Sequence, residues 1–256
     1  MSDTLEGRVA LVTGGSRGVG RAISLAMAAD GADVAVIFRK DQDAADAIVS
    51  EITAMGQRAI ACQSSVTDYD AIRDAVTRVE TELGPIGILV NNAGIASRGK
   101  TVADTDPEEL LRVVSTHALA SHFLSGLVIP KMRELDRGDI VMISSAATQG
   151  LGANGAPYNM AKCALEALAF TLAKEEMANG IRVNIAAPGL VETEMGSRLV
   201  KATQGVDDLR TIDANMPFGH VCQPEEVANV VHFFVSAKNT YVTGERLYIH
   251  GGGARW

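Results

Sequence analysis

A tyrosine and a lysine four residues apart form a pair whose types and spacing suit catalysis. Tyr158 and Lys162 fall within a helical pattern, so both side chains lie on one helical face, with the ammonium near the phenol. A free tyrosine titrates near pH ~10, and a neighbouring cation, with the positive charge of an oxidised nicotinamide, favours the phenolate. Lowering the pKa to neutrality takes about 3 units, or about 4 kcal/mol of differential interaction. A phenol with such a pKa can give a proton to a carbonyl oxygen and take it back in the reverse reaction.

A serine at the end of an apolar run supplies a partner for this pair. We expect Ser145 to close a strand, where its hydroxyl can hold the same carbonyl oxygen by a hydrogen bond. The Tyr-x-x-x-Lys spacing alone is weak evidence, because such pairs arise by chance on ordinary helices. Its weight comes from Ser145 at the carboxyl end of a strand, where open α/β sheets bind their ligands, and from a glycine-rich turn upstream.

The glycine-rich turn follows the first apolar run, at residues 13–20, and leads into a helical pattern. Its glycines let the backbone approach a pyrophosphate, while the free N–H groups and the positive end of the helix dipole face the anion. A purely structural turn is the alternative. The turn lacks the Gly-Lys-Ser/Thr ending of a P-loop, which argues against a nucleoside triphosphatase. The residues that we expect to contact a dinucleotide here are Gly14, Ser16, Arg17, Gly18, Val19 and Gly20.

The end of the second apolar run indicates which dinucleotide binds. A dinucleotide fold places an acid there for NAD or a cation for NADP. Here Phe38 is followed by Arg39 and Lys40, and Arg17 in the glycine turn can converge on the same place. A guanidinium matches a phosphate in two-point geometry, so NADP(H) is favoured over NAD(H). The alternative is that these cations merely form a solvated strand end.

The elements that must position these residues alternate along the chain. Short apolar runs predict strands at 8–13, 33–38, 58–63, 86–90, 139–144, 181–186 and 246–249. Most are continuously apolar, as strands buried on both faces are. Between them, apolar residues recur at three and four residues before glycines 56 and 84, and Asp-Pro-Glu-Glu at 106–109 opens a long helix towards Pro130.

Repeated strand–helix–strand units predict an α/β fold, a doubly wound parallel sheet of about seven strands with helices on both faces, as in the Rossmann fold. No linker divides the chain, so residues 1–256 are expected to form a single dinucleotide-binding domain. Residues 194–220 lie between a loop near the expected cofactor and the next helix, and we expect them to form a lid over the substrate.

Composition excludes several classes of protein. Of 256 residues, 47% are hydrophobic, enough for a sizeable core, which excludes a disordered chain. A formal charge of −8 without a basic run argues against nucleic-acid and membrane partners. Three widely spaced cysteines indicate no disulfide framework and favour the cytoplasm. The five histidines lack metal-ligand spacing, so we expect no metal site.

Taken together, the motifs resemble those of the short-chain dehydrogenase/reductase family over essentially the whole chain, with 3-oxoacyl-acyl-carrier-protein reductases and related carbonyl reductases as the most similar members. The matching segments are Thr13-Gly14-x-x-x-Gly18-x-Gly20, Asn91-Asn92-Ala93-Gly94, Ser145, Tyr158-x-x-x-Lys162, Pro188-Gly189 with Thr193, and Gly251-Gly252.

The resemblance implies roles by position. Tyr158 is then the acid/base, Lys162 binds the nicotinamide ribose and tunes Tyr158, and Ser145 orients the substrate carbonyl. Adenosine-side contacts are implied for Asn92, Ala93 and Gly94, and for Ser65 and Val66, which stand where the family often has Asp-Val. Nicotinamide-side contacts are implied for Pro188, Gly189, Val191 and Thr193.

One departure from the family pattern concerns the proton relay. Family members usually carry an asparagine in the long central helix, and counting along this chain puts Ala118 or His117 in its place. His117 either takes part in the relay or simply packs in the helix, and packing is the expectation. The departure leaves two hypotheses open: an NADP(H)-dependent reductase of carbonyls, 3-oxoacyl thioesters included, or an NADP(H)-binding protein with weak or lost turnover that acts through a partner.

The family and the helices also predict self-association. The helices around 113–132 and 158–177 carry apolar residues on more than one side, more than one sheet can cover. A homo-oligomer is expected on this ground, and the family resemblance implies a tetramer.

Overall fold

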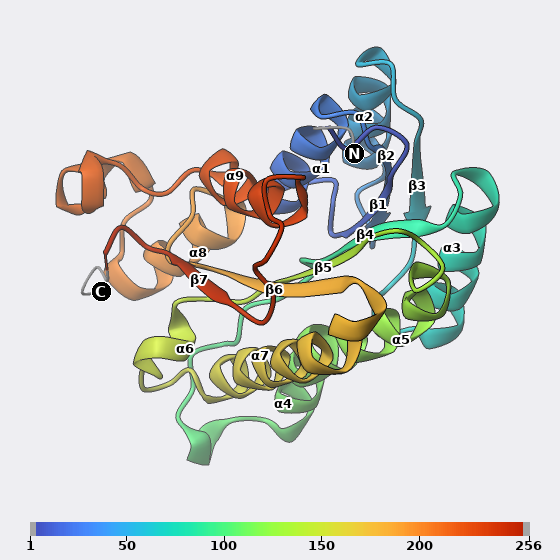
Figure 1. Ribbon diagram of the computed structural model, residues 1–256. Coiled ribbons are helices and arrows are strands. Elements are labelled where there is room, and N and C mark those ends of the chain that lie inside the picture. Colours follow the sequence, from blue (N-terminus) through green and yellow to red (C-terminus); the bar gives the residue numbers. More distant parts are fainter. Residues whose placement is uncertain (1–3, 253–256) are drawn as a thin grey trace.

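The computed structural model describes residues 4–252 and places seven strands in one parallel sheet, in the order β3-β2-β1-β4-β5-β6-β7 (Figure 1). The predicted single domain extends to residues 1–3 and 253–256, which lie outside the described part. The strands are β1 Val9–Thr13, β2 Asp33–Phe38, β3 Ala59–Gln63, β4 Ile86–Asn91, β5 Gly138–Ile143, β6 Ile181–Pro188 and β7 Arg246–Ile249. The predicted doubly wound parallel sheet is confirmed. The predicted strand bounds are correct to within one or two residues, and β2 and β7 match fully.

Helices cover both faces of this sheet (Figure 1). One face carries α1 Gly18–Ala29, α2 Gln42–Ala54 and α9 Pro224–Val235. The other carries α3 Tyr69–Glu82, α4 Pro107–Val114, α5 Ala120–Met132 and α7 Ala156–Glu176. The chain also forms short helices, which are α6 Ala147–Gly150, α8 Glu194–Gln204, η1 Val102–Asp104, η3 Met177–Asn179, η4 Leu209–Asn215 and η5 Pro217–Gly219.

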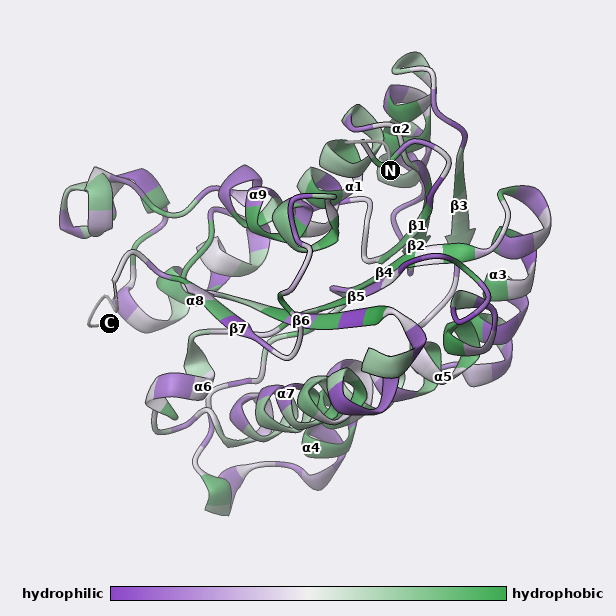
Figure 2. Ribbon diagram, in the orientation of Figure 1, coloured by the Kyte–Doolittle hydropathy of each residue, from purple (hydrophilic) through white to green (hydrophobic). Residues whose placement is uncertain are grey.

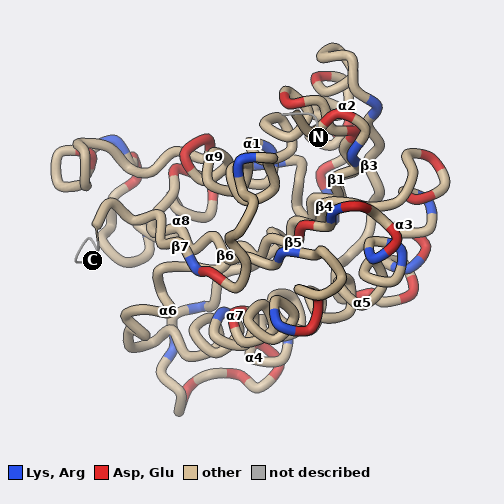
Figure 3. Tube along the Cα trace, in the orientation of Figure 1, with Lys and Arg blue, Asp and Glu red and all other residues tan. Residues whose placement is uncertain are grey.

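The strands are apolar on both sides because each side faces a layer of helices. Every residue of β1, β4 and β5 is buried. Alternate residues of these strands contribute to two hydrophobic clusters, one towards α1, α2 and α9 and the other towards α3, α5 and α7. The strands accordingly lie as green bands between the two layers, and Lys and Arg are interspersed with Asp and Glu along the outer helices (Figures 2 and 3). Continuous rather than alternating hydrophobicity is therefore what this sandwich of layers requires.

The long helix predicted from residue 106 is not a uniform α-helix. Between α4 and α5 the segment η2, Ser115–Leu119, has π-helical hydrogen bonding, and α5 continues past Pro130 to Met132. The predicted helix from residue 106 towards Pro130 is therefore present, with a π-helical segment inside it. The stretch Pro107–Met132 is by length and composition apolar enough to cross a membrane, but half of its most apolar window is buried inside the protein. This burial is what a helix that covers a sheet shows, and it accounts for the apolar composition.

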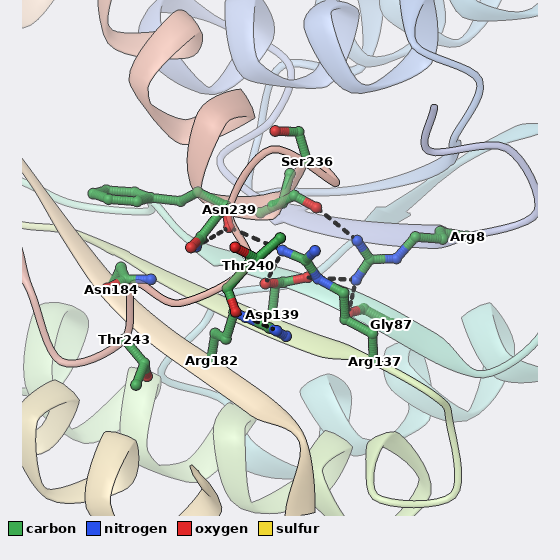
Figure 4. Close-up of polar contacts among 12 residues, drawn as sticks. Arg8, Gly87, Arg137, Asp139, Arg182, Asn184, Ser236, Asn239, Thr240 and Thr243 are labelled. Atoms are coloured by element: carbon green, nitrogen blue, oxygen red, sulfur yellow. Dashed lines mark hydrogen bonds and ion pairs between the residues drawn. The ribbon is translucent and has the colours of Figure 1, made fainter. Parts of the chain in front are cut away.

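At the amino ends of the strands, a buried aspartate binds the guanidinium groups of two arginines (Figure 4). Asp139 at the start of β5 accepts hydrogen bonds from Arg8 at 2.7 Å and from Arg137 at 2.8 and 3.0 Å. Arg8 also donates to the carbonyl of Gly87 in β4 and to that of Val235 at the end of α9. The cluster therefore ties three central strands to α9 at the edge of the sheet opposite the candidate site.

Candidate active site

The carboxyl edge of the sheet brings the three predicted catalytic residues together. Ser145 lies just beyond the carboxyl end of β5, which ends at Ile143, one residue earlier than predicted. Tyr158 and Lys162 lie one turn apart on α7, and the Lys162 Nζ atom is 5.6 Å from the centre of the Tyr158 ring. Lys162 donates a hydrogen bond of 2.6 Å to the carbonyl of Ile143, the last residue of β5. The lysine is thereby fixed between α7 and the strand.

The electrostatics of this pair differ from the expectation. Burial raises the pKa of Tyr158 above its ordinary value, and a hydrogen bond with the Ser145 side chain only partly opposes this rise. Burial lowers the pKa of Lys162 to about 7, against the attraction of Glu166. In the protein alone the pKa of Tyr158 is thus raised, because desolvation disfavours the charged forms of both side chains. The predicted lowering of this pKa needs the positive charge of an oxidised nicotinamide as well as the lysine, and it stays a prediction.

His117 lies beside Tyr158, and Ala118 is buried next to it in the π-helical segment. The two aromatic rings are nearly perpendicular, with their centres 5.4 Å apart. The Nε2 atom of His117 is 2.8 Å from the Ile95 carbonyl oxygen and 3.1 Å from the Ile95 nitrogen, so its tautomer decides which of them it bonds. Burial, with Lys162 nearby, lowers the His117 pKa to about 3. The imidazole is therefore neutral at physiological pH and secures the loop after β4.

The glycine turn is braced by residues that follow β4. The amide of Asn92 donates to the carbonyl of Thr13 at 2.8 Å, and the Thr13 hydroxyl accepts from the backbone of Asn92 and Ala93, each at 2.9 Å. The strand order places β4 beside β1 although the chain reaches β2 and β3 first, so the turn lies where the strand order reverses. Ligands of doubly wound sheets bind at this switch point.

The turn also fits the pyrophosphate of a dinucleotide. A Cβ atom added to Gly20 would lie 2.2 Å from the Gly14 carbonyl oxygen, so only glycine allows this tight passage. Gly14 and Gly18 have φ angles of 63° and 51°, in the left-handed region. No side chain caps the first turn of α1, because its N-cap residue is Arg17. The N–H groups at this helix start are therefore available to an anion.

Three cations lie near the turn, and two carboxylates lie close to one of them. Arg39 and Lys40 are exposed after β2. The Arg17 guanidinium lies 3.6 Å from Asp41 and 3.3 Å from Glu194. All three of these side chains are well exposed, so the pairs are weak and leave Arg17 available to a stronger anion.

The remaining predicted contacts converge on the same edge from three loops. Val66 lines a small cavity together with Thr13 and Ala93, and Ser65 precedes it after β3. The His117 ring occupies the space in which a side chain of Gly94 would stand, 2.4 Å from an added Cβ. After β6, the Thr193 methyl group lies 3.2 Å from an added Cβ of Gly18. The structure therefore brings the glycine turn close to the loop that contains Pro188, Gly189, Val191 and Thr193.

The segment expected to be a lid has a small core of its own. Thr193 caps α8 by accepting a hydrogen bond from the Gly196 nitrogen, and η4 and η5 follow. Val200 and Leu209 of this segment pack with Leu190 and Val221, which flank it, in a hydrophobic cluster separate from the two that cover the sheet.

Sequence reasoning missed Glu166, which lies one helical turn beyond Lys162. Its buried carboxylate accepts hydrogen bonds from Ser144 at 2.6 Å and Thr148 at 2.9 Å, on either side of Ser145 in the sequence. The spacing of four residues from Tyr158 to Lys162 and again to Glu166 was a readable signal. Its partner Arg246 gave no such signal, since it is 80 residues away.

Among residues 4–252, no group of three or more His, Cys, Asp or Glu side chains is placed to hold a metal ion.

Fold and site together define a short-chain dehydrogenase/reductase, and the chain belongs to this family. The family model described as enoyl-(acyl carrier protein) reductase matches residues 14–253. The chain is 37% identical, over 249 residues, to the 3-oxoacyl-[acyl-carrier-protein] reductase FabG of Escherichia coli, covering 96% of this chain and 97% of that protein.

Solved structures are similar over the whole fold. A short-chain dehydrogenase from Burkholderia cenocepacia, in complex with NADP, matches with a TM-score of 0.87 and 35% identity, covering 97% of this chain and 98% of the other. A 7α-hydroxysteroid dehydrogenase, complexed with NADH and 7-oxo glycochenodeoxycholic acid, matches with a TM-score of 0.89 and 29% identity, covering 98% of this chain and 96% of the other. The family therefore accommodates both dinucleotides and different carbonyl compounds within this fold.

Proposed function

We propose that this dehydrogenase/reductase transfers a hydride between NADP(H) and a carbonyl or secondary alcohol, with Ser145, Tyr158 and Lys162 as its catalytic residues. The observation that carries the proposal is the convergence of these three side chains beside the glycine turn, at the switch point of the sheet. The similarity to the E. coli reductase supports 3-oxoacyl thioesters as one class of substrate to test.

The geometry suits proton transfer to a carbonyl oxygen. The bound dinucleotide supplies the hydride that reaches the carbonyl carbon. Tyr158 keeps its proton until it is needed, because burial raises its pKa, and it donates that proton to the oxygen as negative charge develops there. Ser145, whose side chain lowers the pKa of Tyr158 against the effect of burial, holds the same oxygen. The Lys162 ammonium, when charged, stabilises the phenolate that remains.

A carbonyl panel with both cofactors tests the proposal. NADPH oxidation is followed by absorbance with 3-oxoacyl thioesters, cyclic ketones and simple aldehydes, and with NADH in parallel. Turnover of at least one carbonyl supports the proposal. Tight NADPH binding without turnover would instead support the second candidate, a cofactor-binding protein that acts through a partner. The observation that favours that candidate is that neither His117, which lies beside Tyr158, nor Ala118 is the asparagine expected in this helix.

Cofactor preference gives a separate prediction about Arg17 and Arg39. Charge-assisted hydrogen bonds from two guanidinium groups to the 2′-phosphate are each worth about 1.5–3 kcal/mol. The Arg17→Ala/Arg39→Ala double variant is therefore expected to lose at least about 100-fold in kcat/KM for NADPH. With NADH, which has no 2′-phosphate, kcat/KM should stay within about threefold of the wild-type value. Steady-state kinetics with both cofactors measure this, and Arg73→Ala, at an exposed helix position, is the control. An equal loss with NADPH and NADH would contradict the assignment.

We further infer a homotetramer built on α5 and α7. A groove lies between these helices, and the residues that line it include the exposed Pro130, the half-buried Leu168 and the buried Ile129 and Leu172. Light scattering is expected to give about four times the chain mass of 26.9 kDa, and a monomeric mass would contradict the inference.

Within the described residues all three cysteines are free, which suits the reducing cytoplasm. We also infer that residues 194–220 act as a lid over the substrate.

A further inference from the structure

Helix α7 presents a third polar side chain towards β5, one turn beyond the predicted catalytic pair. Tyr158, Lys162 and Glu166 are spaced four residues apart and therefore lie on one face of the helix. All three lie against the residues where β5 ends. Tyr158 lies near the Ser145 side chain, Lys162 donates to the Ile143 carbonyl, and Glu166 accepts from the Ser144 hydroxyl. Both Lys162 and Glu166 are almost fully buried, at 3% and 4% exposure.

Arg246 of β7 holds the Glu166 carboxylate from the other side. Its guanidinium bonds the oxygen of Glu166 that Ser144 and Thr148 do not use. The same guanidinium lies over the Tyr248 ring, 4.6 Å from the ring centre, which fixes its orientation. Each carboxylate oxygen therefore has a partner, as a buried charge requires.

The hydrogen bonds of Glu166 reach both ends of the segment that carries Ser145. Ser144 precedes Ser145 and Thr148 follows it by three residues, and both hydroxyls lie within hydrogen-bond distance of the same carboxylate oxygen. The Thr148 hydroxyl also lies 2.9 Å from the Ser145 carbonyl. One side chain thus restrains the turn between β5 and α6 that orients the Ser145 hydroxyl.

Glu166 also balances the charge of Lys162. The titratable groups that face Lys162 are Tyr158 and Glu166 from its own helix and His117 from the π-helical segment, while β5 offers the Ile143 carbonyl. His117 is neutral above pH about 3, and an ionised Tyr158 would form only during turnover. Glu166 is then the anion that favours the ammonium form of Lys162 against burial.

We propose that Glu166, oriented by Arg246, is a positioning residue of the catalytic site: its carboxylate anchors the segment that carries Ser145 and stabilises the ammonium of Lys162. The inference rests on the proposed function for its kinetic consequence, but its effect on Lys162 is measurable without turnover. Glu166 itself does not touch the reacting atoms, since it acts through Ser144, Thr148 and Lys162.

The Glu166→Gln variant separates this role from a purely structural one. Removing a negative charge makes the Tyr158–Lys162 pair lose its first proton at lower pH, whichever residue releases it. Carbonyl reduction needs that proton, so the alkaline limb of the kcat profile is expected to move to lower pH by about 1 unit. Glu166→Asp keeps the charge, so its limb should stay within about 0.3 unit of wild type while kcat falls from the weakened anchor. Glu134→Gln, at an exposed site at the end of α5, controls for the loss of one charge.

Two further measurements keep the test decisive. Because Gln leaves Arg246 without its anion, the Glu166→Gln/Arg246→Gln double variant is also prepared. It leaves no arginine without its anion and should still move the limb to lower pH, by less than the single variant. NMR titration of lysines labelled at Cε measures Lys162 without turnover, with an expected midpoint near 7 in wild type and about 1 unit lower in Glu166→Gln. A Lys162 midpoint and an alkaline limb unchanged in both folded Gln variants would overturn the inference. Absence of turnover in wild type would instead overturn the proposed function, and the NMR shift would then decide the inference alone.

Discussion

Replacing Tyr158 with phenylalanine is expected to lower carbonyl reduction by about 1,000-fold, the amount that a well-placed general acid contributes. The variant keeps the ring that packs beside His117 and below the Lys162 ammonium, and it loses only the hydroxyl that carries the proton. Since the proton has no other donor at that position, the alkoxide that forms as hydride arrives would have no stabilising partner except Ser145. NADPH absorbance with the best carbonyl of the panel measures the effect.

Binding and control measurements isolate this role. NADPH affinity, followed by fluorescence titration, should change by less than about threefold, because the glycine turn and its bracing by Asn92 are untouched. Tyr241→Phe removes a hydroxyl from a side chain that is 96% exposed and should keep the wild-type rate. Equal rates in wild type and Tyr158→Phe would remove the tyrosine from the mechanism.

Replacing Asp139 with alanine is expected to lower the free energy of unfolding by about 3–5 kcal/mol, the usual cost of breaking a buried ion pair. The substitution leaves the Arg8 and Arg137 side chains, only 18% and 15% exposed, without the carboxylate that both bind (Figure 4). Arg8 keeps its bonds to the Gly87 and Val235 carbonyls, so two positive charges stay close together in a region that water hardly reaches.

Urea unfolding at fixed protein concentration measures this loss. The matched control is Asp70→Ala, which breaks the Asp70–Arg73 pair on the surface of α3, where Asp70 is 90% exposed. The control should change stability by less than about 0.5 kcal/mol. If Asp139→Ala cost no more than its control, the cluster would not be what holds the amino ends of the strands to α9.

The sequence was informative where one local pattern determines the structure. Strands buried on both faces need continuous apolar runs, and those runs located all seven strands. The spacing of Tyr158 and Lys162 similarly placed both side chains on one face of α7. The glycine turn was recognisable because its closest backbone approach, at Gly20, leaves no room for a side chain.

Other features depend on contacts between distant segments, so no local pattern indicated them. The π-helical segment at 115–119 has no distinctive composition, and the Glu166–Arg246 pair joins α7 to β7. The raised pKa of Tyr158 was missed for a related reason: the sequence shows a cation four residues away, but it does not show how fully both groups leave water.

The separate hydrophobic cluster of Leu190, Val200, Leu209 and Val221 has a consequence for how such a protein diversifies. These side chains pack on one another rather than within the two clusters that cover the sheet, so replacements among them leave the scaffold of strands intact. The segment that contains this cluster is thus free to accumulate mutations, while Tyr158 and Lys162 keep their geometry on α7. A fold partitioned in this way can change one part of its surface without first losing the stability of its sheet.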